Sequence, residues 1–142
     1  MKRIFSILLI IFVFVLGSCR KKSDKNKDCT DYDYENCDTS EPFYGKLNLK
    51  LTINNENESV RVLVFEGNYE SGVIIFEDEI NAAEETYYLE LNKKYSAAAY
   101  YSQGNDTIIA VDGGKLESYS YTMCEYTCYD VLNLSLDLRL KE

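Results

Sequence analysis

The amino-acid sequence predicts an all-β domain in which two antiparallel sheets pack face to face. From about residue 43 onward, apolar residues recur at every second position in short stretches, which is typical of half-buried strands. Segments rich in Gly, Asn and Asp separate these stretches, as expected of tight turns. The only helical candidate, Glu77–Glu85, is acidic and has no apolar stripe.

The first two strands differ in how many of their faces are apolar. Lys46–Asn54 alternates strictly, with one apolar face made of Leu47, Leu49, Leu51 and Ile53. A polar turn over Asn54–Ser59 follows. Val60–Phe65 is apolar at every position except Arg61, so both of its faces are expected to be covered, as in a central strand.

The next strands are shorter and rich in tyrosine. Gly67–Gly72 predicts a turn, and Val73–Phe76 a strand that ends at the acidic Glu77–Glu79. Thr86–Leu91 and Tyr95–Tyr101 each alternate again. Both are expected to be strands, because aromatic and β-branched residues suit a pleated, half-buried surface.

The last part of the chain completes the sheets. Gln103–Asp106 is a hairpin turn, since Gly and Asn tolerate positive φ. Thr107–Val111 is its partner strand, ended by Asp112–Gly114, and Leu116–Met123 is the next strand. Leu132–Leu140 alternates most regularly of all.

These stretches give seven or eight short strands over residues 43–142, as in an immunoglobulin-like or transthyretin-like sandwich. The chain contains no tryptophan, so the buried Trp of true immunoglobulin domains is missing. A transthyretin-like or fibronectin-like variant of the sandwich is therefore favoured.

The N-terminus has the plan of a secretory signal. Lys2 and Arg3 precede the apolar stretch Ile4–Leu16. That stretch is shorter than the ~20 residues that cross a bilayer as a helix, which disfavours the alternative of an uncleaved membrane anchor. Small residues then close the segment before Cys19.

Leu16-Gly17-Ser18-Cys19 resembles the lipobox of bacterial lipoproteins. The resemblance implies that the Cys19 thiol is alkylated by diacylglycerol and that cleavage makes Cys19 the first residue. Several acyl chains together hold a protein on a membrane where one chain holds it only marginally. The expected organisation is a signal peptide at residues 1–18, a lipidated flexible tether at 19–42 and the sandwich at 43–142.

Charge is distributed unevenly along the mature chain. Arg20–Lys27 carries five basic residues and one acidic residue directly after Cys19. It either associates with anionic headgroups, at about 1 kcal/mol per basic residue, or is a solvated tether. Residues 28–142 contain eight basic and 23 acidic residues, a net formal charge of −15, which argues against nucleic-acid binding.

Four cysteines remain once Cys19 is assigned to the lipid, and an even number in an exported chain predicts two disulfides. The short gaps favour local pairing, Cys29–Cys37 with Cys124–Cys128. Crossed pairing would instead close a loop of about 90 residues and stabilise the domain by over about 4 kcal/mol. A zinc site of four thiolates is a further alternative, disfavoured in an oxidising compartment.

No enzyme, cofactor or metal site is expected. The chain contains no histidine, which excludes Ser-His-Asp and Cys-His catalysis and His-ligated metals. Five carboxylates crowd into the segment after Lys27 and could hold Ca²⁺. Their spacing departs from the EF-hand loop, with Asn36 in place of the turn glycine and Pro42 in place of the bidentate Glu. A solvated acidic tether is therefore favoured.

Two further sites are hypotheses. Thirteen tyrosines suggest either half-buried sheet faces or a surface that grips a sugar or a protein. Tyr126 and Tyr129 are the preferred ligand residues, because the sequence places them in or beside a Cys124–Cys128 loop and loops carry function. Asp106-Thr107-Ile108 resembles the three-residue O-glycosylation site of some Gram-negative envelopes, which would make Thr107 the acceptor; the alternative is an ordinary turn that leads into a strand.

The signal segment and most of residues 43–140 are similar to small, uncharacterised cell-envelope lipoproteins of Gram-negative bacteria. The residues that carry this resemblance are Leu16–Cys19, Phe43–Leu47, Asp106–Leu116 and the cysteine-containing approach to the final strand. The resemblance implies fold and location. Because the residues after Cys19 are basic and not acidic, it indicates the periplasmic face of the outer membrane.

The leading functional hypothesis is a membrane-anchored, non-enzymatic module that binds a protein or a glycan. The alternative is a structural or accessory subunit of a larger envelope complex, joined by pairing of edge strands.

Overall fold

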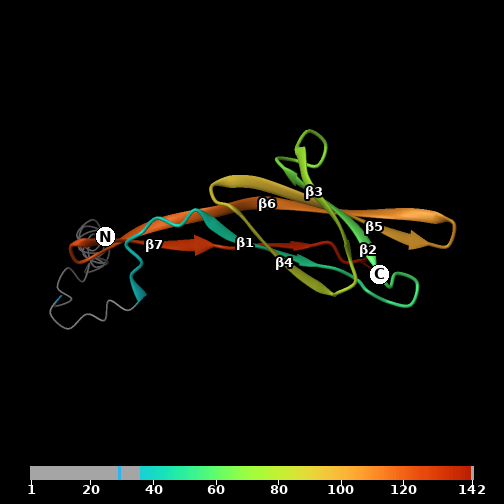
Figure 1. Cartoon of the computed structure of the whole chain (residues 1–142), viewed down its shortest axis with the longest axis horizontal. Helices are drawn as coiled ribbons and strands as arrows, with labels where there is room; N and C mark the ends of the chain where they lie inside the picture. The colour runs from blue at the N-terminus through green and yellow to red at the C-terminus, as the bar shows by residue number, and fades with distance from the viewer. Residues whose placement is uncertain (1–28, 30–35, 142) are drawn as a thin grey trace, which may run out of the picture. The chain divides into compact units, whose positions relative to one another are not determined.

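The computed structural model describes Cys29 and residues 36–141, and it confirms the all-β sandwich. The described residues form eight strands in two sheets and no α-helix (Figure 1). The strands are β1 (Tyr44–Lys50), β2 (Val60–Glu66), β3 (Val73–Ile80), β4 (Glu84–Glu90), β5 (Lys93–Gln103), β6 (Asp106–Met123), β7 (Tyr126–Leu132) and β8 (Leu134–Asp137).

One sheet has the strand order β4-β1-β8 and the other β3-β2-β5-β6-β7. The apolar faces of both sheets meet in one core, because the predicted alternation puts every second residue inward. Its fully buried members come from β1, β2, β5 and the C-terminal segment. As expected for a central strand, β2 lies between β3 and β5 and is buried at every position except its last residue and Arg61.

One pairing departs from the antiparallel prediction, because β1 and β8 run parallel. The chain leaves the five-stranded sheet at the end of β7 and enters the three-stranded sheet as β8. Asn133 lies at this crossing, and its side-chain oxygen accepts a hydrogen bond from the backbone N–H of Lys46 at 2.8 Å. The predicted strand Leu132–Leu140 is therefore wrong as one element, since Leu132 ends β7 in one sheet, Leu134–Asp137 is β8 in the other, and residues 138–140 are in no strand.

The prediction that Asp112–Gly114 ends a strand is also wrong, because β6 runs without interruption through both glycines. These glycines serve close packing and do not make a turn. A Cβ atom on Gly114 would lie 2.6 Å from a methyl carbon of Leu134, and one on Gly113 would lie 3.0 Å from Cβ of Ser96. Neither glycine has a positive φ, whereas the turn glycines Gly67 and Gly104 do.

The acidic residues after Phe76 extend β3 and do not end it, because β2 and the residue before it provide partners for them. Glu77 forms an ion pair with Arg61 of β2, and Glu79 accepts a hydrogen bond from Ser59 at 2.6 Å.

The described disulfide between Cys37 and Cys128 crosses the domain instead of closing a local loop. Cys37 and Cys128 are bonded across 91 positions of sequence, which rules out the favoured local pairing. Cys29 and Cys124 are also disulfide-bonded. The short gaps in sequence mislead because Cys128 lies within β7, and β7 is held beside residues 36–38 of the expected tether. There the Tyr129 N–H donates to the Asp38 carbonyl at 2.8 Å.

Candidate functional site

Two candidate sites lie along β6, whose halves have different neighbours. Residues 106–116 pair with β5 and residues 117–123 pair with β7. The two-residue turn Gly104-Asn105 makes Gln103 and Asp106 a hydrogen-bonded pair, and hydrogen-bonded pairs alternate along an antiparallel ladder. The even-numbered residues of the first half therefore bond to β5, and the odd-numbered ones direct their N–H and C=O groups to the other side.

That other side is an open sheet edge at Thr107, Ile109 and Val111. In the described part of the chain, no strand pairs with β6 there, because β7 pairs only with the second half. The side chains of Ile109 and Val111 are each 45% exposed. We call this stretch the β6 edge.

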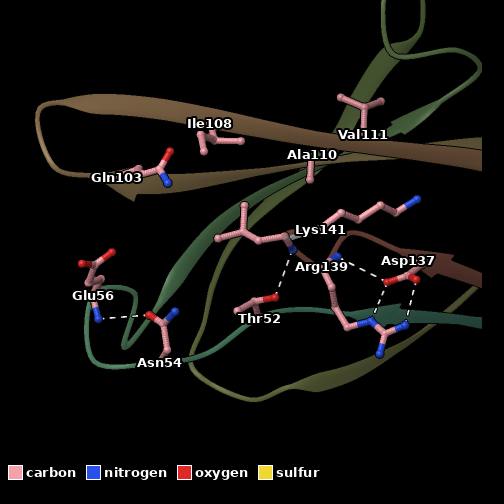
Figure 2. Close-up of a pocket in the computed structure, with 11 residues that line it drawn as sticks. Thr52, Asn54, Glu56, Gln103, Ile108, Ala110, Val111, Asp137, Arg139 and Lys141 are labelled. Carbon is pink, nitrogen blue, oxygen red and sulfur yellow. Dashed lines mark hydrogen bonds and ion pairs between the residues drawn. The ribbon is translucent and has the colours of Figure 1, made fainter.

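A groove of about 500 Å³ runs beside the β6 edge. Figure 2 shows Gln103, Ile108 and Ala110 on its β5–β6 side, facing Thr52 and the chain end. Its described lining comprises Thr52, Asn54, Glu56, Gln103, Ile108, Ala110, Val111, Asp137, Arg139, Leu140 and Lys141. The groove thus combines a short apolar strip with a polar rim, as ligand-binding grooves commonly do.

The C-terminal segment forms one wall of this groove and is held by specific bonds. The Leu140 N–H donates to the Thr52 hydroxyl at 3.0 Å. The Arg139 guanidinium donates to both carboxylate oxygens of Asp137, at 2.7 and 2.8 Å. These hydrogen bonds hold the pKa of the Asp137 carboxyl well below its usual range, although the pair is exposed to solvent.

Lowering the pH should therefore weaken the Asp137–Arg139 contact that helps to hold this wall. Because the folded-state pKa of Asp137 is depressed, the pair contributes stability above the ordinary Asp value near 3.8, and this is lost as the pH falls towards the folded-state pKa. An NMR titration of the Asp137 carboxyl carbon should give a midpoint below 3.8, and Arg139→Gln should move it upward. A midpoint unchanged by Arg139→Gln would contradict the assignment.

The second candidate site is a cavity of about 470 Å³ beside the β6–β7 hairpin. Its described lining is Asn36, Asp38, Pro42, Tyr121, Tyr129, Asp130 and Val131. We call it the hairpin cavity. It contains two tyrosines and two carboxylates, and none of its described lining residues is basic.

Hydrogen bonds fix the polar groups at the hairpin cavity. The Tyr119 hydroxyl donates to Asp130 at 2.9 Å, and the Val131 N–H donates to the other oxygen of that carboxylate at 2.7 Å. The bond to Asp130 raises the pKa of Tyr119. The Tyr121 hydroxyl donates to the Asn36 carbonyl at 3.2 Å, and the rings of Tyr119 and Tyr121 lie 6.2 Å apart between centroids.

The structure separates the two tyrosines preferred from the sequence. The expected Cys124–Cys128 loop is wrong, because Cys124 and Glu125 form a two-residue turn and both tyrosines belong to β7. Being three positions apart on a strand, Tyr126 and Tyr129 face opposite sides of the sheet. Tyr129 lines the hairpin cavity from the face opposite to Tyr121 and Asp130, because the register sets it against Ser120. Tyr126 is 53% exposed and is not among the described lining residues.

Sequence reasoning includes Tyr119 and Tyr121 among the strand tyrosines of a possible ligand surface but does not single them out, and it misses Asp130. The alternation of Tyr119 and Tyr121 could have placed them on one face. Asp130 could not be added without the register, which sets it opposite Tyr119.

The remaining predicted sites are placed only in part. Thr107 is exposed as the second residue of β6, beside the turn. Cys19, the basic stretch and most of the acidic segment lie outside the described residues. Of that acidic segment, Asp38 is described, and its carboxylate accepts a hydrogen bond from the Ser40 N–H at 2.9 Å.

The fold and these sites together define a small β-sandwich with a surface groove and a tyrosine-lined cavity. No protein-family model, curated protein or solved structure matches this chain. Within the described residues, no helix is long and apolar enough to cross a membrane.

Proposed function

We propose that the protein is a lipid-anchored, non-enzymatic binding module of the bacterial envelope that binds a glycan at the hairpin cavity. The observation that carries this proposal is the composition of the cavity, where Tyr121 and the fixed Asp130 carboxylate share one face of the hairpin and none of the described lining residues is basic.

This composition suits a neutral sugar. The apolar C–H faces of a pyranose pack on an aromatic ring, and its hydroxyls donate to carboxylates, which only accept hydrogen bonds. The Asp130 carboxylate is already oriented by Tyr119 and Val131, so less freedom is lost when a ligand binds. Two carboxylates without a basic neighbour disfavour phosphorylated, sulfated or uronic sugars.

The anchor and location rest on the sequence. The secretory signal and the lipobox support attachment through Cys19, and the basic residues that follow support the periplasmic face of the outer membrane. Mass spectrometry of the purified chain should find a diacylglyceryl group on an N-terminal Cys19. An unmodified Cys19, or a retained signal peptide, would refute this.

Glycan binding can be tested with the full chain purified in detergent. On an array of neutral and acidic oligosaccharides, we expect binding confined to neutral glycans. Replacing Tyr121 by Ala should weaken that binding by about tenfold, the upper range for one aromatic contact. The matched control Tyr88→Ala removes a tyrosine that is 66% exposed on β4, outside the cavity, and should change nothing.

Two results would overturn the proposal. One is an array on which no neutral glycan binds. The other is equal binding by Tyr121→Ala and the unmodified chain, with both proteins folded by circular dichroism.

A further inference from the structure

The β6 edge presents a row of backbone groups ready to pair with another strand. The ladder with β5 is made by the even-numbered residues, so Thr107, Ile109 and Val111 turn their N–H and C=O groups away from it. Unpaired edges of this kind are templates for strand addition.

The path of the chain explains why the edge is open. β7 lies on the same side of β6 but pairs only from Glu117 onward, and after Leu132 the chain crosses to the other sheet. The Asp112 carboxylate closes the near end, since it accepts hydrogen bonds from the backbone N–H groups of Gly113 and Asp137, each at 2.8 Å. The open stretch therefore extends from Asp112 back to the β5–β6 turn.

Space for the side chains of an added strand exists on both faces. On the inner face, Ile108 and Ala110 border the groove of about 500 Å³ (Figure 2). On the outer face, Ile109 and Val111 lie in register with Tyr100 and Ala98 of β5. An added strand could thus place alternate side chains in the groove and against these exposed aliphatic residues.

Charge indicates what kind of strand would pair. The basic lining residues Arg139 and Lys141 lie on the Asp137 side of the groove (Figure 2). Glu56 lines the opposite end, near the β5–β6 turn, and Asp106 begins β6 at that turn. Within the described residues, neither carboxylate takes part in an ion pair. With a net formal charge of −15 over residues 28–142, the domain attracts basic segments.

A second copy of the chain suits the edge poorly. In a symmetric antiparallel pair centred on Ile109, Asp106 of each copy would lie opposite Asp112 of the other. Like charges directly opposite each other destabilise a sheet, and two acidic domains repel as well.

We infer that the β6 edge binds an extended segment of a partner protein, apolar at alternate positions and basic at its end, by adding it to the five-stranded sheet. The inference is independent of the glycan proposal, because the hairpin cavity lies beside the other half of β6.

Backbone amide exchange provides the most specific test. The full chain in detergent is mixed with the acetylated peptide Lys-Val-Thr-Val-Thr-Val-Lys and followed by NMR. We expect the peptide to slow exchange at Thr107, Ile109 and Val111. Exchange at Ile108 and Ala110, whose amides are already bonded to β5, should not change. Protection at all five residues alike, or at none, would overturn the inference.

Matched variants separate the contribution of the backbone amide to peptide binding from that of the side chain. Ile109→Pro removes an N–H that points to the open edge, a position where a sheet tolerates proline, and should weaken peptide binding by about tenfold or more. Ile109→Thr keeps both the amide and a β-branched side chain, and should bind within about threefold of the unmodified chain. Thermal melting confirms that both variants are folded. Equal peptide binding by the two variants would overturn the inference.

Charge and self-association complete the test. The corresponding peptide with Glu at both ends should bind at least about tenfold more weakly, and Asp106→Lys should reduce this preference.

Slow exchange at the β6 edge without peptide, together with a dimer in sedimentation, would overturn the inference in favour of self-pairing. Tyr121→Ala should leave peptide binding unchanged, so the peptide and glycan proposals can fail separately.

Discussion

Removing the disulfide between Cys37 and Cys128 by the double substitution Cys37→Ser/Cys128→Ser should lower the free energy of unfolding by about 4 kcal/mol. The bond joins residues 91 positions apart, so its loss gives the unfolded chain much more conformational freedom. Replacing both cysteines avoids a lone thiol that could exchange with the remaining disulfide. Urea denaturation should show a lower midpoint and a steeper slope, since the unfolded state becomes more expanded.

The same substitution has a local consequence at the hairpin cavity. The disulfide holds Asn36 and Asp38 beside β7, where the Tyr129 N–H donates to the Asp38 carbonyl. Without it, amide exchange at Tyr129 should accelerate more than exchange in β2. Ser120→Ala is the matched control, an exposed change in the same hairpin, and should cost less than about 0.5 kcal/mol. A double variant as stable as this control would contradict the expectation.

The sequence predicted the strands well wherever side-chain alternation reports local packing. Val60–Phe65 was recognised as central because both of its faces are apolar, and the hairpin at Gly104-Asn105 because its turn uses a glycine with positive φ. Both signals are local. They depend on the residues themselves and their immediate neighbours, and not on where the chain goes next.

The errors arose where a residue's role depends on a distant neighbour. Gly113 and Gly114 look like a turn, but they make room for Ser96 and Leu134. The short gap between Cys124 and Cys128 suggests a disulfide loop, and the turn at Cys124 carries no sequence signal, because a non-glycine residue takes the positive φ there. That missing turn signal hid β7, and with it the register that brings Tyr119 to Asp130.

The β6 edge was beyond sequence reasoning for a related reason. Thr107–Val111 is visible as a strand, but no local pattern says which of its sides will have a neighbour. That is decided at Asn133, where the chain changes sheet and β7 ends. The open edge is thus a property of topology. The groove beside it depends on how the residues after β8 run along the three-stranded sheet.

Those last residues are held by Tyr101, and its substitutions should have the other large effect on stability. The side chain is fully buried in the core. Its hydroxyl donates to the Leu138 carbonyl at 2.9 Å and accepts from the Thr52 N–H at 3.1 Å. Burial raises the pKa of Tyr101, so the neutral phenol persists at neutral pH and bridges β5 to the segments that follow β1 and β8.

Tyr101→Phe should cost about 1–3 kcal/mol, because it keeps the ring but leaves the Leu138 carbonyl and the Thr52 N–H without this partner in the interior. Tyr101→Ala should cost about 3–5 kcal/mol, since it also empties space in the core. Tyr88→Phe, which removes a hydroxyl from a side chain that is 66% exposed, should change the free energy of unfolding by less than about 0.5 kcal/mol.

The Tyr101→Phe variant also links stability to the groove. The Leu138 N–H bonds to the Lys50 carbonyl and the Leu140 N–H to the Thr52 hydroxyl, so loosening this segment should speed amide exchange at both leucines. Because the segment walls the groove, peptide binding at the β6 edge should weaken even where the variant remains fully folded. Unchanged exchange at Leu138 and Leu140, or a loss of stability no greater than that of Tyr88→Phe, would show that the hydroxyl does not fasten the chain end.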